Sequence, residues 1–121
     1  MRTLEIGTRK HTQVNVLDEK GSGNANHEYE VVTSLPTQQS PQIILGKVSF
    51  QNGPIKEVGV NGVANEDLIA IVIDRLCGFQ SGDYACRDNG IALTKLEEAL
   101  MWLRNRTNER EARGVEGTHA K

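Results

Sequence analysis

The stretch from Asp88 to Glu116 constrains the fold more than any other part of the chain, because its apolar residues recur at helical spacing. Successive steps of four and three residues keep one set of positions on a single face of an α-helix. That face begins polar, becomes apolar and ends cationic, and it comprises Asn89, Leu93, Leu96, Leu100, Leu103, Thr107 and Arg110. We therefore expect a long amphipathic helix that ends near Arg113, where Gly114 is placed to terminate it.

A second helix is expected upstream, from about residue 66 to residue 80, and Asn65 is placed to cap its N-terminus. This segment is apolar nearly all round between Leu68 and Ile73, which packing on one sheet face would not require. A second partner surface is therefore implied. The chain then turns back at FQSGDYACRD, so residues 63–113 are expected to form an antiparallel helical hairpin.

Residues 2–58 are expected to be β-rich, because short runs of alternating apolar and polar residues are typical of half-buried strands. The apolar members of these runs are Leu4 and Ile6, Val14 and Val16, Tyr29, Val31 and Leu35, then Ile43, Leu45, Val48 and Phe50. Asn52-Gly53 and Asn61-Gly62 are good tight-turn dipeptides between the sheet and the helices. The expected fold class is therefore α+β, a small N-terminal antiparallel β-sheet followed by a C-terminal antiparallel two-helix hairpin.

Composition bounds the size and the partners of the protein. A chain of 121 residues is expected to form one domain, 1–121, with a tail at 114–121 that is mobile beyond Gly117. Its residues are 37% hydrophobic but only 4% aromatic, which indicates a thin aliphatic core and favours sharing surface with other subunits. A net charge of -2 argues against a general binder of DNA or of membrane surfaces.

The two cysteines, Cys77 and Cys86, match neither a zinc knuckle nor a redox motif. We interpret them as buried or half-buried thiols of an intracellular protein, with a disulfide between the helix ends as the alternative. The N-terminus has no apolar signal core, and no run approaches the roughly 20 apolar residues of a membrane span. The protein is therefore expected in the cytoplasm.

Three arginines near the end of the long helix form the first candidate site. Arg106, Arg110 and Arg113 lie about one turn apart and can donate bidentate hydrogen bonds to phosphate oxygens. The alternative is a solvated helix end, where arginine favours the helix dipole and can pair with Glu109 or Glu116. Spacing alone leaves both interpretations open.

The hairpin turn carries the second candidate. Phe79, beside a glycine-containing break, can offer its ring to a nucleobase, or it can simply close the core. Asn89 lies on the inward stripe, where an amide is costly without a partner, so a ligand or an inter-subunit hydrogen bond is expected. An aromatic ring for stacking, together with the arginines of the first candidate site, would suit a nucleotide ligand.

The turn at residues 81–88 is a third candidate. Its backbone amides and Arg87 can surround a polyanion if copies of the chain meet on a symmetry axis. The alternative is that Arg87 pairs with Asp83 or Asp88 within the same loop.

Catalytic and metal sites are not indicated. His11, His27 and His119 lack metal-ligand spacing, and no GxSxG, HExxH or Walker motif occurs. Glu97 and Glu98 are adjacent, so on a helix they project about 100° apart and do not form an acid pair. No enzymatic activity, metal or cofactor is therefore expected.

Residues 59–119 resemble the phage-encoded Thoeris anti-defence sponges, first type, which share their helical hairpin with the anti-CBASS cyclic-dinucleotide sponges. The resemblance rests on GVNGVANEDLIAIVIDRLCGFQSGDYACRDN and LTKLEEALMWLRNRTNEREARGVEGTH, within which LEEALMWL and RxxxRxxRGVEG are specific. It implies a protein of the infected bacterial cell that binds an immune signalling nucleotide and hides it from its effector without cleaving it.

The resemblance also implies the ligand and its site. The main ligand would be glycocyclic ADP-ribose made by a TIR-domain enzyme, held in recessed pockets between subunits. Phe79 would stack on the adenine, Asn89 would hydrogen-bond the ligand, and Arg106 and Arg110 would hold the base or the pyrophosphate, with Arg113 as a neighbour. The assembly would be a homohexamer built as a trimer of dimers. A second site for cyclic trinucleotides would use the turn residues Ser81, Gly82, Arg87 and Asp88.

Two other functions stay open. One is a helical-hairpin module that binds or oligomerises proteins through its apolar first helix and takes no small molecule. The other is a phosphodiesterase that acts on the same signals, for which the sequence provides no acid–base or metal set.

Overall fold

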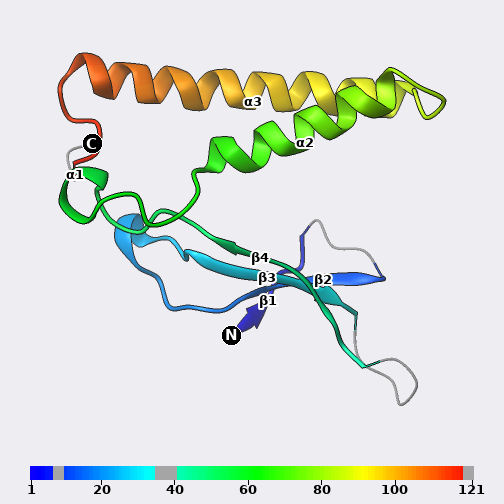
Figure 1. Ribbon diagram of the computed structural model, residues 1–121, viewed down its shortest axis with the longest axis horizontal. Helices are drawn as coiled ribbons and strands as arrows, with labels where there is room; N and C mark the ends of the chain where they lie inside the picture. The colour runs from blue at the N-terminus through cyan, green and yellow to red at the C-terminus, as the bar shows by residue number, and fades with distance from the viewer. Residues whose placement is uncertain (7–9, 35–40, 119–121) are drawn as a thin grey trace. The chain divides into compact units, whose positions relative to one another are not determined.

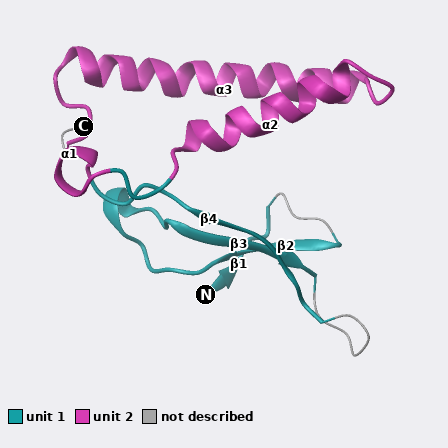
Figure 2. Cartoon of the chain, in the orientation of Figure 1, with its two compact units in different colours: residues 1–53, 60–62 teal, residues 54–59, 63–121 magenta. Residues whose placement is uncertain are grey.

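The computed structural model describes residues 1–6, 10–34 and 41–118 (Figure 1). The chain divides into two compact units, one of residues 1–53 and 60–62 and one of residues 54–59 and 63–121 (Figure 2). The first unit is an antiparallel β-sheet and the second is helical. The α+β fold class expected from the sequence is therefore confirmed.

Four strands form the sheet, in the order β1-β2-β3-β4, and every neighbouring pair is antiparallel. The strands are β1 (Arg2–Thr3), β2 (Thr12–Val16), β3 (Glu28–Thr33) and β4 (Ile44–Ser49). The expected first strand is misplaced, because β1 ends before Leu4 and Ile6. The Leu4 N–H still donates to the carbonyl of Val14 at 2.8 Å, after which the chain leaves the sheet. Leu35, expected to extend β3, lies outside the described residues.

The two faces of the sheet differ in chemistry. Val16 opposes Tyr29 on one face, and the Tyr29 ring meets that of Phe50 edge-on, with centroids 5.6 Å apart. Asn15 opposes Glu30 on the other face and is 2% exposed. The side chains that hydrogen-bond the Asn15 amide are Thr3, Gln13 and Glu30. Because the buried amide is satisfied by this network, it specifies the pairing of β1, β2 and β3.

Residues 51–62 contain a helical turn that the alternating pattern did not predict, α1 (Ile55–Val58). The Asn61 side chain accepts the Asn52 N–H at 2.8 Å and donates to the Asn52 carbonyl at 2.7 Å. Gly53 has φ +96°, as a glycine turn requires. Gly62 is required for a different reason, because the backbone of Phe50 passes close to it. A Cβ at residue 62 would lie 2.4 Å from the carbonyl carbon of Phe50.

The hairpin comprises α2 (Asn65–Gln80) and α3 (Arg87–Ala112), which run side by side in opposite directions from a tight turn (Figure 1). Asn65 is not the cap of α2, because Ala64 occupies the N-cap position and Asp67 accepts the Ala64 N–H at 2.8 Å. After α3, Gly114 has φ +72°, so it terminates the helix as expected.

Packing within the hairpin follows the expected stripe of α3. Its half-buried or buried positions are Asn89, Gly90, Leu93, Leu96, Leu100, Leu103, Thr107 and Arg110. No apolar residue of α2 or α3 is fully buried. Large apolar side chains stay exposed on both helices, with Ile71 and Trp102 each 65% accessible. The exposed apolar area supports the inference that the hairpin has a further partner surface.

Candidate functional site

The turn that joins α2 to α3 is held by side chains at both of its ends. Gln80 accepts the Cys86 N–H at 2.9 Å and donates to the Cys86 carbonyl at 3.0 Å. Cys86 is in turn the N-cap of α3, where its thiol accepts the Asn89 N–H at 3.4 Å. Because both helix ends are fixed to the same six-residue connection, the side chains beside it have a defined geometry.

Phe79 stands at this end of the hairpin, half-buried between two partners. The guanidinium carbon of Arg75 lies 5.0 Å from the centroid of its ring, and the Tyr84 ring meets it nearly edge-on at 6.2 Å. Asn89 approaches the same cluster through its Nδ2 atom, 3.5 Å from the Tyr84 carbonyl oxygen. The sequence-predicted pair Phe79 and Asn89 thus shares one end of the hairpin with an arginine. Arg75 was not predicted from the sequence. Its spacing of four residues from Phe79 could have indicated it, because side chains at i and i+4 are neighbours on a helix.

The arginine cluster lies at the opposite end of α3. Arg110 is 8% exposed, and its Nε lies 3.3 Å from a carboxylate oxygen of Glu116. Its Nη2 donates to the carbonyl oxygens of Val115 and Thr118, both at 3.1 Å. The pairing with Glu116 that the sequence left open is therefore formed. Arg106 is exposed in the last turns of α3, and Arg113 is the C-cap residue.

The segment after α3 folds back over Arg110. Residues 115–118 are half-buried, and the Thr118 hydroxyl donates to the Val115 carbonyl at 2.5 Å. Gly117, with φ +79°, accepts the backbone N–H of Lys56 in α1 at 3.1 Å. The tail expected to be mobile beyond Gly117 is thus bonded up to Thr118, and residues 119–121 lie outside the described part of the chain.

One chain does not bring the two halves of the predicted site together. Asn89 and Arg110 are 21 positions apart in the same α-helix, which corresponds to about 31 Å along its axis. Arg106 is about 26 Å from Asn89 by the same measure. A nucleotide that contacts both ends must therefore draw them from different copies.

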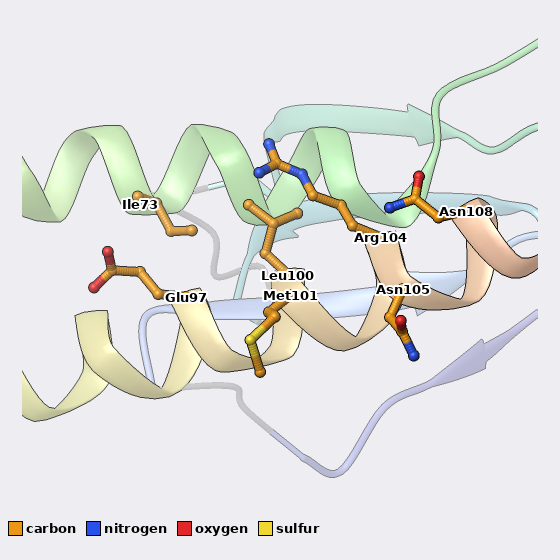
Figure 3. A pocket seen from close by; sticks show the side chains of 7 residues that line it. All are labelled: Ile73, Glu97, Leu100, Met101, Arg104, Asn105 and Asn108. Atoms are coloured by element: carbon orange, nitrogen blue, oxygen red, sulfur yellow. The ribbon is translucent and has the colours of Figure 1, made fainter.

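Between the two ends of the hairpin, α2 and α3 line an open groove with a volume of about 480 Å³. Ile73 contributes from α2, and the remaining lining comes from α3 (Figure 3). These α3 residues are Glu97, Leu100, Met101, Arg104, Asn105 and Asn108. The groove is apolar towards Leu100 and polar towards Asn108, and none of the residues predicted to bind the ligand lines it.

The residues predicted for a second site belong to the hairpin turn and to the start of α3. The Ser81 hydroxyl donates to the Gly78 carbonyl at 2.8 Å, and the Gly82 N–H donates to the Phe79 carbonyl at 3.2 Å. Arg87 and Asp88 are exposed in the first turn of α3. Within the described residues Arg87 forms no ion pair, so the alternative pairing with Asp83 or Asp88 is not formed.

Both cysteines differ from expectation, because Cys77 and Cys86 are free and exposed. Cys86 is exposed because its thiol caps α3 and does not pack in a core. Over the described ranges, no group of three or more His, Cys, Asp or Glu side chains is arranged to hold a metal ion. In the same residues, no helix is both long and apolar enough to cross a membrane.

Comparisons with known proteins show which sequences this chain is similar to. Residues 42–107 match a family model described as Acb2/Tad1, hairpin domain. This span contains β4, α1, α2 and most of α3. The chain is also 47% identical, over 142 aligned positions and the full length of both proteins, to Thoeris anti-defense 1 of Bacillus phage SBSphiJ7. The similarity therefore extends beyond the motifs at 59–119 and includes the sheet.

Proposed function

The chain belongs to the Acb2/Tad1 hairpin family, and from this premise we propose that it acts against a bacterial immune system by binding and sequestering a signalling nucleotide. The name of the 47% identical relative states an action against Thoeris defence. The proposed ligand is glycocyclic ADP-ribose, and the proposed place of action is the cytoplasm of an infected bacterial cell. Sequestration requires affinity and abundance, and no catalytic group takes part.

The chemistry of this ligand suits the two ends of the hairpin. An adenine offers two π-faces and hydrogen-bonding edges, which suit the ring of Phe79 and the amide of Asn89. A pyrophosphate carries two negative charges, which suit the guanidinium groups of Arg106, Arg110 and Arg113. The observation that carries the proposal is that each half of this binding set lies at its own end of the α2–α3 hairpin.

The separation of the two halves favours a pocket shared by two copies. If two α3 helices pair in antiparallel fashion about a two-fold axis, the Asn89 end of one copy lies beside the Arg110 end of the other. The axis would then cross α3 midway between these residues, between Ala99 and Leu100. Met101 and Trp102, within one helical turn of that point, are 56% and 65% exposed and lie outside the half-buried stripe of α3. An apolar patch at the axis supplies the driving force for such a dimer.

A larger assembly is proposed from the family resemblance. Three such dimers would form a hexamer, in which the turn residues Ser81, Gly82, Arg87 and Asp88 of several copies gather on a three-fold axis. Exposed Arg87 side chains and turn amides suit a second polyanion such as a cyclic trinucleotide.

Recovery of an intact ligand tests the proposed function. The purified protein is incubated with synthetic glycocyclic ADP-ribose, separated from free ligand, heat-denatured, and the released material is analysed by mass spectrometry. The expected result is stoichiometric recovery of unchanged ligand. A cleaved product would show a phosphodiesterase, and an empty protein would exclude sequestration of this ligand.

A second candidate function is a protein–protein interaction module without a small-molecule ligand. The exposed Ile71 and Val72 on α2 favour it, because they offer a second apolar surface. The same experiment distinguishes the two, since the interaction module leaves the protein empty even after incubation with lysate from infected, defence-bearing cells.

A further inference from the structure

Arg110 is the one arginine or lysine that is buried in the described residues. Three of the residues that enclose it come from the segment just after α3: Val115, Glu116 and Thr118. The segment is closed by a backbone bond from the Val115 N–H to the carbonyl of Arg110 itself, at 3.0 Å. A residue proposed to meet a pyrophosphate is thus already covered by its own C-terminal neighbours.

The Glu116 carboxylate holds the position that a phosphate oxygen would take. One of its oxygens lies 3.3 Å from the Arg110 Nε, and a guanidinium Nε–H can serve only one close acceptor. A carboxylate and a phosphate are both anionic acceptors of similar geometry for guanidinium. The two anions therefore exclude one another at this atom.

We propose that residues 114–118 form an intramolecular clasp in which Glu116 is a competing anion on Arg110, and that the ligand's pyrophosphate binds by displacing it. This inference rests on the proposed function and adds a residue that determines affinity. Glu116 suppresses the attraction of Arg110 for weak anions, because a monoanion gains too little to displace a carboxylate that is attached to the same chain.

The size of the effect follows from the exposure of the pair. The Glu116 side chain is 37% accessible, and ion pairs at such partly exposed sites are weak. Removal of the competing charge should therefore tighten ligand binding by about two- to fivefold. Glu116→Gln keeps the shape of the side chain and an acceptor oxygen. Residues 114–118 can therefore still fold over Arg110, but without the competing charge.

The test compares three full-length proteins by isothermal titration calorimetry with synthetic glycocyclic ADP-ribose: unmodified, Glu116→Gln and Glu111→Gln. Glu111 is exposed at the end of α3, so its variant matches the change in net charge without touching Arg110. The expected result is tighter binding for Glu116→Gln than for both others. Equal or weaker binding by Glu116→Gln than by Glu111→Gln overturns the clasp while leaving the proposed function intact, whereas no binding by the unmodified protein overturns both.

Hydrogen exchange provides a second measurement that does not depend on a variant. If the ligand displaces the clasp, the Val115 and Thr118 amides, which donate to Arg110 and Val115, should exchange faster in the complex than in the free protein. Slower exchange at both amides would contradict displacement.

Discussion

The guanidinium of Arg75 lies over the ring of Phe79, one helical turn further along α2, with 5.0 Å between its central carbon and the ring centroid. Tyr84 meets the same ring nearly edge-on from the hairpin turn. A cation on one face of a phenyl ring leaves base stacking to the opposite face. The orientation of Phe79 is therefore set within one chain, before any ligand or second copy is present.

Replacement of Phe79 by leucine should weaken binding of glycocyclic ADP-ribose by about five- to 150-fold, because the loss of one base–aromatic stack costs about 1–3 kcal/mol. Leucine keeps apolar volume at the helix end, so the hairpin should remain folded. Calorimetry with the purified variant measures the change. Tyr84→Phe, which removes only a hydroxyl at a 77% exposed position, is the matched control, and an unchanged affinity for Phe79→Leu would remove Phe79 from the site.

Trp102→Glu should convert the protein to a monomer and abolish ligand binding together. Trp102 is exposed near the middle of α3, where two antiparallel copies would bury it, and a charge there would be desolvated without a partner. Light scattering after size-exclusion chromatography measures the assembly, with Trp102→Phe as the apolar control. A monomer that still binds the nucleotide tightly would contradict a shared pocket.

The stability of the sheet should fall in acid through Asp18. Partial burial raises the pKa of this carboxyl, but hydrogen bonds from the backbone N–H groups of His27 and Glu28 lower it further, so the net pKa lies below its ordinary value. The ionised form is therefore favoured by folding. Its stabilising contribution is present above the ordinary pKa of an aspartate carboxyl and is lost as the pH falls through the lower folded-state pKa.

Thermal unfolding at pH 7 and at pH 3, followed by circular dichroism, checks this assignment. Asp18→Asn should lower the melting temperature at pH 7 and show a smaller further loss on acidification than the unmodified protein. Glu19→Gln, an exposed neighbour, should behave as the unmodified protein does. Parallel pH dependence in Asp18→Asn and the unmodified protein would exclude Asp18 as the source.

Periodicity predicted the helical part of the fold well because it reports which side of a helix is covered. The stripe from Asn89 to Arg110 coincides with the half-buried face of α3, and the positive φ of Gly114 ends that region. The separation of Asn89 from Arg110 also follows from helix geometry, since their spacing and the rise per residue determine it. The proposal of a shared pocket therefore follows from the sequence and from helix geometry alone.

Contacts made by irregular backbone were not open to such inference. The bond from the Lys56 N–H to the Gly117 carbonyl and the return of Glu116 onto Arg110 join segments that no periodic pattern relates. Spacing offered Glu109 and Glu116 as equal partners for the arginines, and only the folded tail selects Glu116. The cap of α2 was missed for a similar reason, because Asp67 bonds the backbone of Ala64 and makes an asparagine cap unnecessary.

We propose that each pocket combines Phe79 of one copy with Arg106 of another, and subunit complementation tests this pairing. Chains carrying Phe79→Leu and chains carrying Arg106→Ala are co-expressed with different tags, and the mixed dimers are isolated by two affinity steps. Arg106 is chosen because, unlike Arg110, it does not hold the C-terminal segment. In a mixed dimer, one of the two pockets regains both residues. Each variant alone is expected to bind glycocyclic ADP-ribose weakly, whereas the mixed dimer should bind it with the affinity of the unmodified protein at about half of its sites. Mixed dimers that bind as weakly as either variant alone would contradict this pairing.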